Sequence, residues 1–506
     1  MKLADIIDTF ITGDWGEESP TQDTPNAAYC VRGADIVPIT NHNFTDIPQR
    51  YVCDRTKETK LLAAGDLVIE KSGGSPTQST GRIVYVSEDL IKAKGNVVCS
   101  NFCTAFRVKA GWNPLYVYYF WQNVYNHGAF FNFEGKTSGI KNLQLDNALS
   151  AIDIEYLPLE KQNQIVASLA SIDEKIKVNR QINDNLEAMA KQLYDYWFVQ
   201  FDFPNEEGKP YKSSGGAMVW NEKLKREIPQ GWDFCFLENL LTIKNGRDHK
   251  HLADGIYPVY GSGGEMRKAS EYLYDGESVL MPRKGSLNNI MYVNEAFWTV
   301  DTMFYSEMKQ SNCAKYIYYT IKDIDFTRWD SGTGVPSMTS STLYSIKLVK
   351  PQSEILKKFD EVISPLFEHM KQISEQNSVL TKQRDELIPL LMNGQASVNY
   401  HLSASTSISF DISVLFLNFT NGNSLYETIS LDYQCFALPL HSKENTHGTI
   451  QEDKRHIQQR QRQGDKHARG RFLAFFYKCT STVHQAAFGN AWCYRGYKGK
   501  DISESK

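Results

Sequence analysis

The sequence lacks the marks of a secreted, membrane-spanning or zinc-binding protein. It has nine cysteines in 506 residues, and the only close pair, Cys99 and Cys103, has no second Cys or His pair at zinc spacing. We expect reduced, mostly buried thiols and a cytoplasmic protein. The chain reaches Asp8 before an apolar segment of signal-peptide length can form. The most apolar C-terminal stretch, residues 408–419, is interrupted by Asp411 and is shorter than the ~20 residues that span a bilayer, so we expect no membrane segment.

The chain also lacks a strong excess of either charge. Its formal net charge is −4, with 42 basic and 50 acidic side chains in residues 1–400 and 13 basic and 9 acidic ones in residues 401–506. Nonspecific binding to DNA depends on many Lys and Arg side chains that neutralise phosphates. The charge balance therefore argues against a protein that coats DNA nonspecifically, and any surface for nucleic acid must be local.

Motifs of catalysis are missing as well. The sequence has no phosphate-binding loop with a Gly-Lys-Ser/Thr ending, no His-Glu-x-x-His and no Gly-x-Ser-x-Gly. The Gly-Ser-Gly-Gly at 261–264 lacks the downstream acidic residue of a nucleotide-binding turn. Asn-Pro-Leu-Tyr at 113–116 differs by one residue from the Asn-Pro-Pro-Tyr of adenine methyltransferases, but no glycine turn for S-adenosylmethionine (SAM) precedes it. The sequence shows no active site.

What the sequence does contain is an internal repeat with a period close to 200 residues. Both copies have Gly-rich turns between short β-type runs and then a Tyr-x-Tyr-Tyr motif. Matching segments are 3–14 with 237–248, 65–73 with 276–285, 116–119 with 316–319, and loosely 135–143 with 332–343. These patterns predict two mixed α/β (α+β) units in pseudo-repeat.

Each copy ends in a long helical pattern. Seam positions spaced alternately by three and four residues run from Leu356 to Leu391, with Asn377 and Arg384 as polar members. In the first copy the apolar positions run 165, 169, 172, 176 and then 182, 186, 189, 193, so we expect a change of winding at 178–180. The two helices, at about 160–198 and 353–393, would each be roughly 55 Å long and would pair antiparallel with each other.

Residue types that bind phosphates and base edges occur on the loops of both copies. Solvated surface charge is the alternative for any one of them. The candidates in the first copy are Lys71, Ser72, Arg82, Lys136, Thr137 and Lys141; in the second they are Arg247, His249, Lys250, Arg283, Lys284, Asn288 and Asn289.

Four aromatic residues after the first helix are too apolar for an exposed linker: Trp197, Phe198, Phe201 and Phe203. Because aromatic residues are enriched at interfaces, they are candidates for docking a partner protein. Packing on the globular units is the alternative.

Residues 157–202, from Leu-Pro-Leu-Glu-Lys-Gln to Tyr-Trp-Phe-Val-Gln-Phe-Asp, resemble the central conserved region of type I restriction-modification specificity subunits. Tyr-Pro-Val-Tyr-Gly-Ser-Gly-Gly at 257–264 resembles a frequent opening of their target recognition domains, and the likeness extends over residues 1 to about 399. The resemblance implies two target recognition domains, each reading half of a bipartite DNA site, with helices that set the spacing and dock methyltransferase subunits.

The resemblance also implies the partners, which are double-stranded DNA, two methyltransferase subunits and restriction subunits with endonuclease and translocase activity. It implies no catalytic residue, metal or cofactor in this chain, with SAM, ATP and Mg²⁺ held by the partners. The domains expected are recognition domain 1 at 1–156, a central helical spacer at 157–203, a linker at 204–228 that is mobile around 213–216, recognition domain 2 at 229–350, a second helical spacer at 351–394 and an unassigned tail at 395–506.

Residues 401–506 match nothing in that family. A poorly ordered appendage is the favoured interpretation, and an extra small domain, an out-of-frame extension and an auxiliary DNA-binding arm stay open. Two other functions remain as alternatives to DNA recognition: a diverged adenine methyltransferase or nuclease, and a noncatalytic coiled-coil scaffold that binds only protein.

Overall fold

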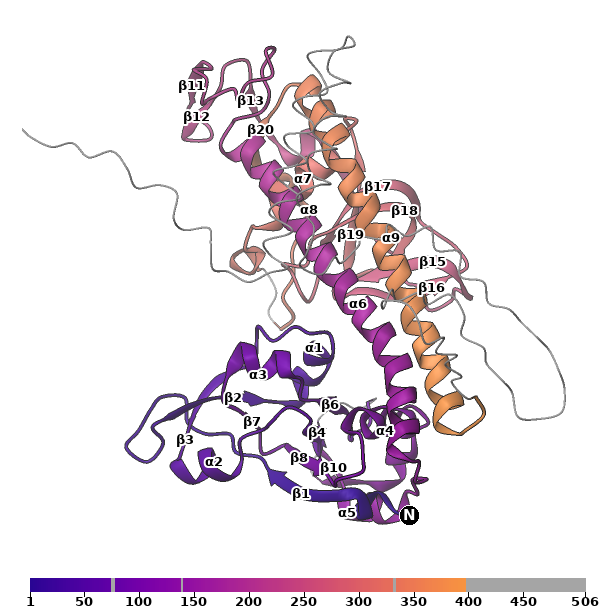
Figure 1. Ribbon diagram of the computed structural model, residues 1–506. Helices are drawn as coiled ribbons and strands as arrows, with labels where there is room; N and C mark the ends of the chain where they lie inside the picture. The colour runs from indigo at the N-terminus through magenta and orange to yellow at the C-terminus, as the bar shows by residue number, and fades with distance from the viewer. Residues whose placement is uncertain (74–77, 138–139, 331–333, 397–506) are drawn as a thin grey trace, which may run out of the picture. The chain divides into compact units, whose positions relative to one another are not determined.

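The computed structural model describes residues 1–73, 78–137, 140–330 and 334–396 (Figure 1). The side chains of Lys136 and Thr137 and the expectations for residues 397–506 lie outside this description. Over the described ranges, none of the helices combines the length and apolarity needed to cross a membrane. We call residues 1–156 the first repeat and residues 229–350 the second repeat.

The first repeat is built on three small sheets with five short helices. The largest sheet is antiparallel, in the order β1 (Ile7–Thr12), β8 (Cys103–Val108), β4 (Leu67–Glu70) and β6 (Ile83–Tyr85). A second has the order β3 (Gln49–Val52), β2 (Asn26–Val31) and β7 (Val97–Cys99), and a third has the order β5 (Ser72–Gly73), β10 (Ile140–Leu143) and β9 (Glu134–Thr137). The helices are α1 (Ile36–Thr40), α2 (Asp54–Thr59), α3 (Glu88–Lys94), α4 (Pro114–Asn126) and α5 (Leu145–Ala151).

The second repeat has one larger sheet and fewer helices. Its six strands have the order β14 (Leu241–Asn245), β19 (Met303–Met308), β17 (Tyr274–Pro282), β18 (Met291–Thr299), β15 (Asp254–Gly261) and β16 (Gly264–Ala269). β13 (Asp233–Phe236) pairs with β20 (Lys347–Lys350), and the helices are α7 (Ala314–Lys322) and α8 (Ser340–Tyr344).

The two repeats share one topology, which confirms the pseudo-repeat seen in the sequence. β4 lies between β8 and β6 in the first repeat, as β17 lies between β19 and β18 in the second. The outer strands β1 and β14 pair antiparallel with β8 and β19. Each repeat also has one parallel contact, between β2 and β7 in the first and between β15 and β18 in the second.

Two long helices follow the repeats, as predicted. α6 spans Leu159–Tyr194 and continues as a π-helical turn at Asp195–Val199, and α9 spans Ser353–Met392. Arg384 of α9 donates to Asp173 of α6 at 2.9 Å. Ten residues further along α6, Asn183 donates to Ser374 of α9 at 3.0 Å. Partner numbers therefore fall along α9 as they rise along α6, and the predicted antiparallel pairing is confirmed (Figure 1).

α6 is a continuous helix at 178–180, and the six-residue step on which the expected change of winding rests disappears when two polar seam residues are counted. Asn179 is 1% exposed and donates to Gln376 and Asn377 at 2.7 and 2.8 Å, so a polar side chain occupies the seam. The next seam position is Asn183, whereas Ile182 is 36% exposed. The spacing of three and four is unbroken once these two asparagines are counted.

Both long helices are built into the cores of both repeats. The first core contains Ile165 and Leu169 of α6 and also Ile388 and Leu391 near the end of α9. The second core contains residues from the other end of each helix: Ala190, Tyr194, Leu356, Phe359 and Ile363. The helix pair is thus stabilised by tertiary packing at both ends.

The segment at 204–228, expected as a partly mobile linker, is folded in the structure. Asp202 accepts hydrogen bonds from the Ser213 amide at 2.7 Å and from its hydroxyl at 2.5 Å. The strands β11 (Met218–Asn221) and β12 (Arg226–Pro229) then form a hairpin. The Ser-Ser-Gly-Gly at 213–216 therefore begins in a hydrogen-bonded turn.

The cysteines agree with the prediction of reduced, buried thiols. Six cysteines of the described ranges are free, and five of these are buried. Burial raises the pKa of Cys103 and Cys235 to about 11 and that of Cys30 and Cys313 to about 12. These thiols act as small apolar core residues.

Candidate nucleic-acid interface

A tight turn at residues 100–102 joins β7 to β8 and organises the basic loops of the first repeat. The Cys103 amide donates to the carbonyl of Ser100 at 2.9 Å, which closes the turn. The carbonyl of Phe102 accepts the amides of Lys71 at 2.8 Å and Ser72 at 3.1 Å. The turn therefore fixes the backbone of the loop that carries these two candidate residues.

An equivalent turn at residues 300–302 precedes β19 in the second repeat. The carbonyl of Thr302 accepts the amides of Arg283 at 2.8 Å and Lys284 at 3.2 Å. The Arg247 amide donates to the carbonyl of Thr299 at 2.9 Å, and Arg283 Nη1 lies 3.4 Å from the carbonyl of Asp301. Three of the basic residues proposed for the second repeat are thus gathered around one turn.

A glycine lets the chain pass close to each turn. A Cβ atom on Gly13 would lie 1.9 Å from the Ser100 carbonyl oxygen, and one on Gly246 would lie 2.0 Å from that of Val300. The following amides, of Asp14 and Arg247, donate to the strand before the turn at 2.7 and 2.9 Å. Both glycines are required for close approach and not for an unusual φ.

A third segment meets the same loop in each repeat. In the first, Lys141 and Asn142 of β10 pair with Gly73 and Ser72, and the backbones of Lys136 and Thr137 lie opposite Lys141 and Ile140. The Leu143 amide donates to the Lys71 carbonyl at 2.7 Å. In the second repeat the Met338 amide donates to the Arg283 carbonyl at 2.9 Å. The structure therefore brings Lys71, Ser72, Lys136, Thr137 and Lys141 together.

Two of these candidates have carboxylate partners within the repeat. Arg82 donates through Nε and Nη2 to Glu70, each at 2.7 Å, and this pairing raises the pKa of the guanidinium. Lys141 is buried, with Nζ 3.2 Å from the Gln78 carbonyl and 3.6 Å from Glu134 Oε2. Both residues hold the loops in place, and a direct contact with DNA stays a prediction for them.

The second repeat divides its candidates in the same way. Asn288 donates to Asp325 at 3.2 Å and accepts the Phe326 amide at 2.8 Å. Asn289 donates to the Ser262 carbonyl at 2.9 Å, and His249 Nδ1 lies 3.3 Å from Arg267 Nε. These three side chains order neighbouring loops. The exposed basic candidates are Arg247, Lys250 and Lys284, and Arg283 is half-buried.

The four aromatic residues proposed for partner docking lie inside the second core. Trp197, Phe198, Phe201 and Phe203 are only 3–5% exposed. The ring of Phe198 lies 4.7 Å from that of Tyr316 and 4.8 Å from that of Phe359, and Phe203 stacks on Trp232 at 4.8 Å. Core packing, the alternative interpretation, accounts for all four side chains because little ring surface is left for a partner.

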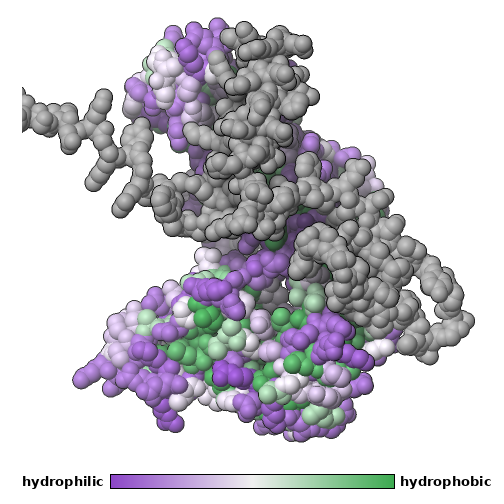
Figure 2. All heavy atoms as spheres, viewed as in Figure 1, coloured by the Kyte–Doolittle hydropathy of each residue, from purple (hydrophilic) through white to green (hydrophobic). Residues whose placement is uncertain are grey.

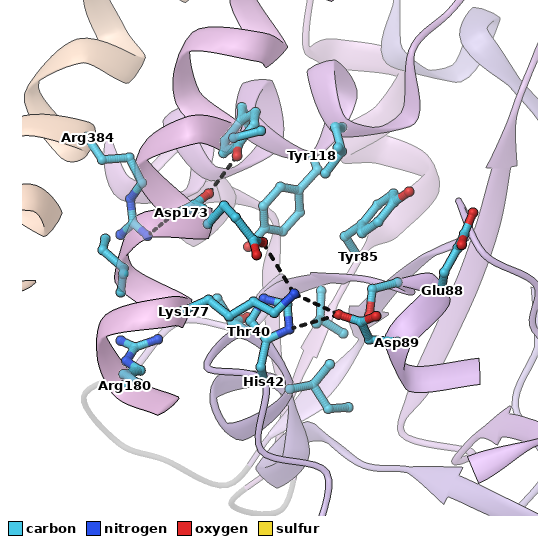
Figure 3. A pocket seen from close by; sticks show the side chains of 18 residues that line it. Thr40, His42, Tyr85, Glu88, Asp89, Tyr118, Asp173, Lys177, Arg180 and Arg384 are labelled. Carbon is cyan, nitrogen blue, oxygen red and sulfur yellow. Dashed lines mark hydrogen bonds and ion pairs between the residues drawn. The ribbon is translucent and has the colours of Figure 1, made fainter. Parts of the chain in front are cut away.

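A charged pocket lies where the first repeat meets α6 and α9 (Figure 3). Lys177 of α6 donates to Asp89 at 2.8 Å, and Tyr119 of α4 donates to Asp173 at 2.5 Å. The other oxygen of Asp173 accepts from Arg384 at 2.9 Å. His42 lines the same pocket, and burial, followed by the nearby Lys177 charge, lowers its pKa.

The second repeat is attached to α6 by the same device. Tyr319 of α7 donates to Glu187 of α6 at 3.1 Å, just as Tyr119 donates to Asp173. The last tyrosine of the repeated Tyr-x-Tyr-Tyr motif thus binds the long helix α6, and its first tyrosine is buried in the core of its own repeat. The motif therefore joins each repeat to α6. In the described ranges no three His, Cys, Asp or Glu side chains are grouped as metal ligands would be.

The side chains of the two turns lie beside the basic loops and are not among the residues that the sequence pattern selects. Asn101 and Phe102 in the first repeat, and Asp301 in the second, are exposed, and Thr302 is half-buried. None of them is basic. The one sequence signal for these positions is the alignment of the two repeats, in which Gly13 corresponds to Gly246.

Comparison with known proteins gives a family match over most of the chain. Residues 3–188 and 229–376 match the family model described as the type I restriction modification DNA specificity domain. The two matched segments contain the two repeats and most of both long helices.

Curated relatives match parts of the chain. A type I restriction enzyme MjaIX specificity subunit from Methanocaldococcus jannaschii is 26% identical over 281 residues, which are 50% of this chain and 62% of that protein. A type I restriction enzyme HindI specificity subunit from Haemophilus influenzae is 20% identical over 49% of this chain and 70% of that protein. The chain thus spans less than two thirds of the first of these relatives. The solved S subunit of a type I restriction-modification system from M. genitalium is 15% identical, with a TM-score of 0.44 over 77% of this chain and 95% of that one.

Proposed function

The chain belongs to the family of type I restriction-modification DNA specificity domains, and from this premise we propose that it recognises both halves of a bipartite DNA site. In this proposal the first repeat reads one half and the second repeat reads the other. The chain itself performs no catalysis. It directs partner enzymes to the sequence.

One observation supports this proposal above the others. Both repeats present a basic loop, Lys71 and Ser72 in one and Arg283 and Lys284 in the other, on the carbonyl of an equivalent turn. Basic and hydroxyl side chains on a fixed loop are suited to bind phosphates, and such contacts set the position of a protein on a duplex. Two copies of one such surface fit two half-sites better than one catalytic centre.

The partners are part of the proposal. We infer that the chain assembles with two methyltransferase subunits and with restriction subunits, and that SAM, ATP and Mg²⁺ enter with these proteins. The complex would act on DNA in the cytoplasm. The recognition domains at 1–156 and 229–350, with spacers at 157–203 and 351–394, stay the proposed division of the chain.

The proposal is tested by selecting bound sequences from a random duplex library with the chain assembled with its methyltransferase subunits. We expect two short defined sequences separated by a gap of fixed length. Lys71→Ala should weaken binding through one half and Arg283→Ala or Lys284→Ala through the other. Each substitution that removes a phosphate contact should also reduce the salt slope by about one. Lys92→Ala on α3, whose side chain is 71% exposed, is the matched control for loss of charge.

Two outcomes would contradict the proposal. A complex that selects no sequence would favour the protein-binding scaffold. Methyl transfer to DNA by the highly purified single chain would favour the diverged methyltransferase.

A further inference from the structure

We propose that the two equivalent turns carry the base-reading side chains: Asn101 and Phe102 in the first repeat, and Asp301 and Thr302 in the second. This inference rests on the proposed function and deepens it. It assigns discrimination between bases to four residues outside the basic loops, and it leaves the basic loops to bind phosphates.

The burial pattern directs these side chains outward. In the first turn Ser100 and Cys103 are 2% and 0% exposed, whereas Phe102 between them is 57% exposed and Asn101 is exposed as well. In the second turn Val300 and Met303 are 5% and 0% exposed, and Asp301 is exposed. The ends of each turn are thus fixed in the protein, Asn101, Phe102 and Asp301 face solvent, and Thr302 is half-buried. A large phenyl ring held at such a position presents apolar surface that a bound ligand would cover.

The turns are also preorganised, as sites of specificity need to be. Each is joined to a buried strand, closed by its own hydrogen bond and packed against a glycine that leaves no space for a side chain. Its last carbonyl is held by two amides of the basic loop. Side chains on such a scaffold keep their direction when DNA binds. Figure 2 shows hydrophobic residues among hydrophilic ones on the visible face of the first repeat.

The four side chains have the chemistry of base recognition in the major groove. The amide of Asn101 can pair with the N6 and N7 edge of adenine, and the Phe102 ring can contact the methyl group of thymine. The carboxylate of Asp301 can accept a hydrogen bond from N4 of cytosine, and the Thr302 methyl group can contact thymine. A carboxylate would repel phosphate, so Asp301 next to Arg283 and Lys284 fits a base contact and not a backbone contact.

The two turns have corresponding backbone hydrogen bonds but different side chains at their two middle positions. Asn stands in one where Asp stands in the other, and Phe stands where Thr stands, although the hydrogen bonds around both turns correspond. Two half-sites of different sequence require this combination of one scaffold and two sets of side chains. We therefore expect adenine at the position read by Asn101 and cytosine at the position read by Asp301.

A reciprocal exchange tests the inference in the assembled complex, with the duplex library selection used above. Asn101→Asp should change the preferred base from adenine to cytosine at one position of one half-site, and Asp301→Asn should change cytosine to adenine at one position of the other. Phe102→Ala should reduce discrimination about tenfold at one neighbouring position. Phe131→Ala, which removes a ring that is 60% exposed outside the turn, is the matched control.

The results separate the inference from the proposed function. If the unchanged chain selects a bipartite site and all three turn variants select the same site with the same discrimination, the inference is wrong and the proposed function stands. A uniform loss of affinity for every sequence would also overturn it, because that is the result of a phosphate contact or of a damaged fold. If the unchanged chain selects no sequence, the proposed function itself fails.

Discussion

Gly13 and Gly246 show how single residues fix the same detail in two distant parts of the chain. A methyl group at either position would penetrate a carbonyl of the adjacent turn, at 1.9 and 2.0 Å, so the backbone would have to move. We expect Gly13→Ala and Gly246→Ala to destabilise their repeats by roughly 1–3 kcal/mol or more, as overpacking does, and to lower discrimination in one half-site each. Denaturant unfolding followed by intrinsic fluorescence measures the first effect.

Gly263→Ala is the control for this experiment, since an added Cβ there meets no atom within 4 Å and φ is not positive. It should change stability by no more than a few tenths of a kcal/mol. Equal unfolding midpoints for all three variants would show that the turns do not have the described geometry.

The thiols give a second test at this scale. The hydrogen bond with Thr56 lowers the pKa of Cys53, which is only half-buried, whereas burial raises the pKa of Cys103 to about 11. A thiol with a pKa near 11 is about 0.1% thiolate at pH 8, and the thiolate is the reactive form. In the folded chain we expect a maleimide to label Cys53 well before Cys103, and labelling of Cys103 to accelerate as the pH rises. Mass spectrometry of the peptides reports each site, and labelling of the two at one rate would contradict the buried core at Cys103.

The residue types predicted which loops are basic, but not which of their basic side chains pair with carboxylates inside the repeat. In the sequence, Lys71, Arg82 and Lys141 are all basic residues, and nothing near them in the chain distinguishes their roles. Only the fold shows that Arg82 lies on Glu70 and Lys141 near Glu134, while the Lys71 backbone is held by the turn. Partners that are between seven and 31 residues away in the sequence follow from strand pairing, and no local pattern encodes that pairing.

At the scale of elements, the pattern of apolar residues did not predict that polar residues occupy part of the seam between α6 and α9. The heptads predicted both long helices because three-and-four spacing is directly visible in leucine and isoleucine positions. The apolar positions alone leave out the asparagines at 179 and 183, which produces a six-residue step in the repeat. The structure shows them bonded across the pair, where polar seam residues fix register.

This assignment predicts different costs for neighbouring substitutions in α6. Ile176→Ala, at a position 2% exposed, should cost about 2–5 kcal/mol of stability, whereas Ile182→Ala should cost less than about 1 kcal/mol. Asn179→Ala removes the hydrogen bonds that this side chain donates to the half-buried amide oxygens of Gln376 and Asn377, at a cost of about 0.5–1.5 kcal/mol. Hydrogen exchange of the amides at 170–186 reports the local effect. If Ile182→Ala lowers the stability as much as Ile176→Ala does, Ile182 faces α9 and the assignment of Asn179 and Asn183 to the seam is wrong.

At the scale of the whole molecule, each long helix is attached to both repeats. On α6 the attachments are Asp173 and Lys177 to the first repeat and Glu187 to the second. On α9 they are Arg384, through Asp173, and Lys371, which lies 3.1 Å from Glu295 of the second repeat. Between these attachments the two helices are joined through Asn179 and Asn183, so a change in the length of this stretch should alter the spacing of the proposed half-sites.

The helix pair is tested as a ruler by inserting whole heptads at facing positions, after Asp184 in α6 and after Ile373 in α9. Three heptads in each helix keep the seam in register and add about 31 Å. Base pairs rise ~3.4 Å, so this length equals about nine base pairs, close to one turn of the duplex. The selected gap should grow by nine or ten base pairs while both half-sites keep their sequence. One heptad in each helix adds about 10 Å, or three base pairs, which places the second half-site about a third of a turn out of phase, so binding should fall at every gap. A folded three-heptad variant that still selects the original gap would show that something other than the helices sets the spacing.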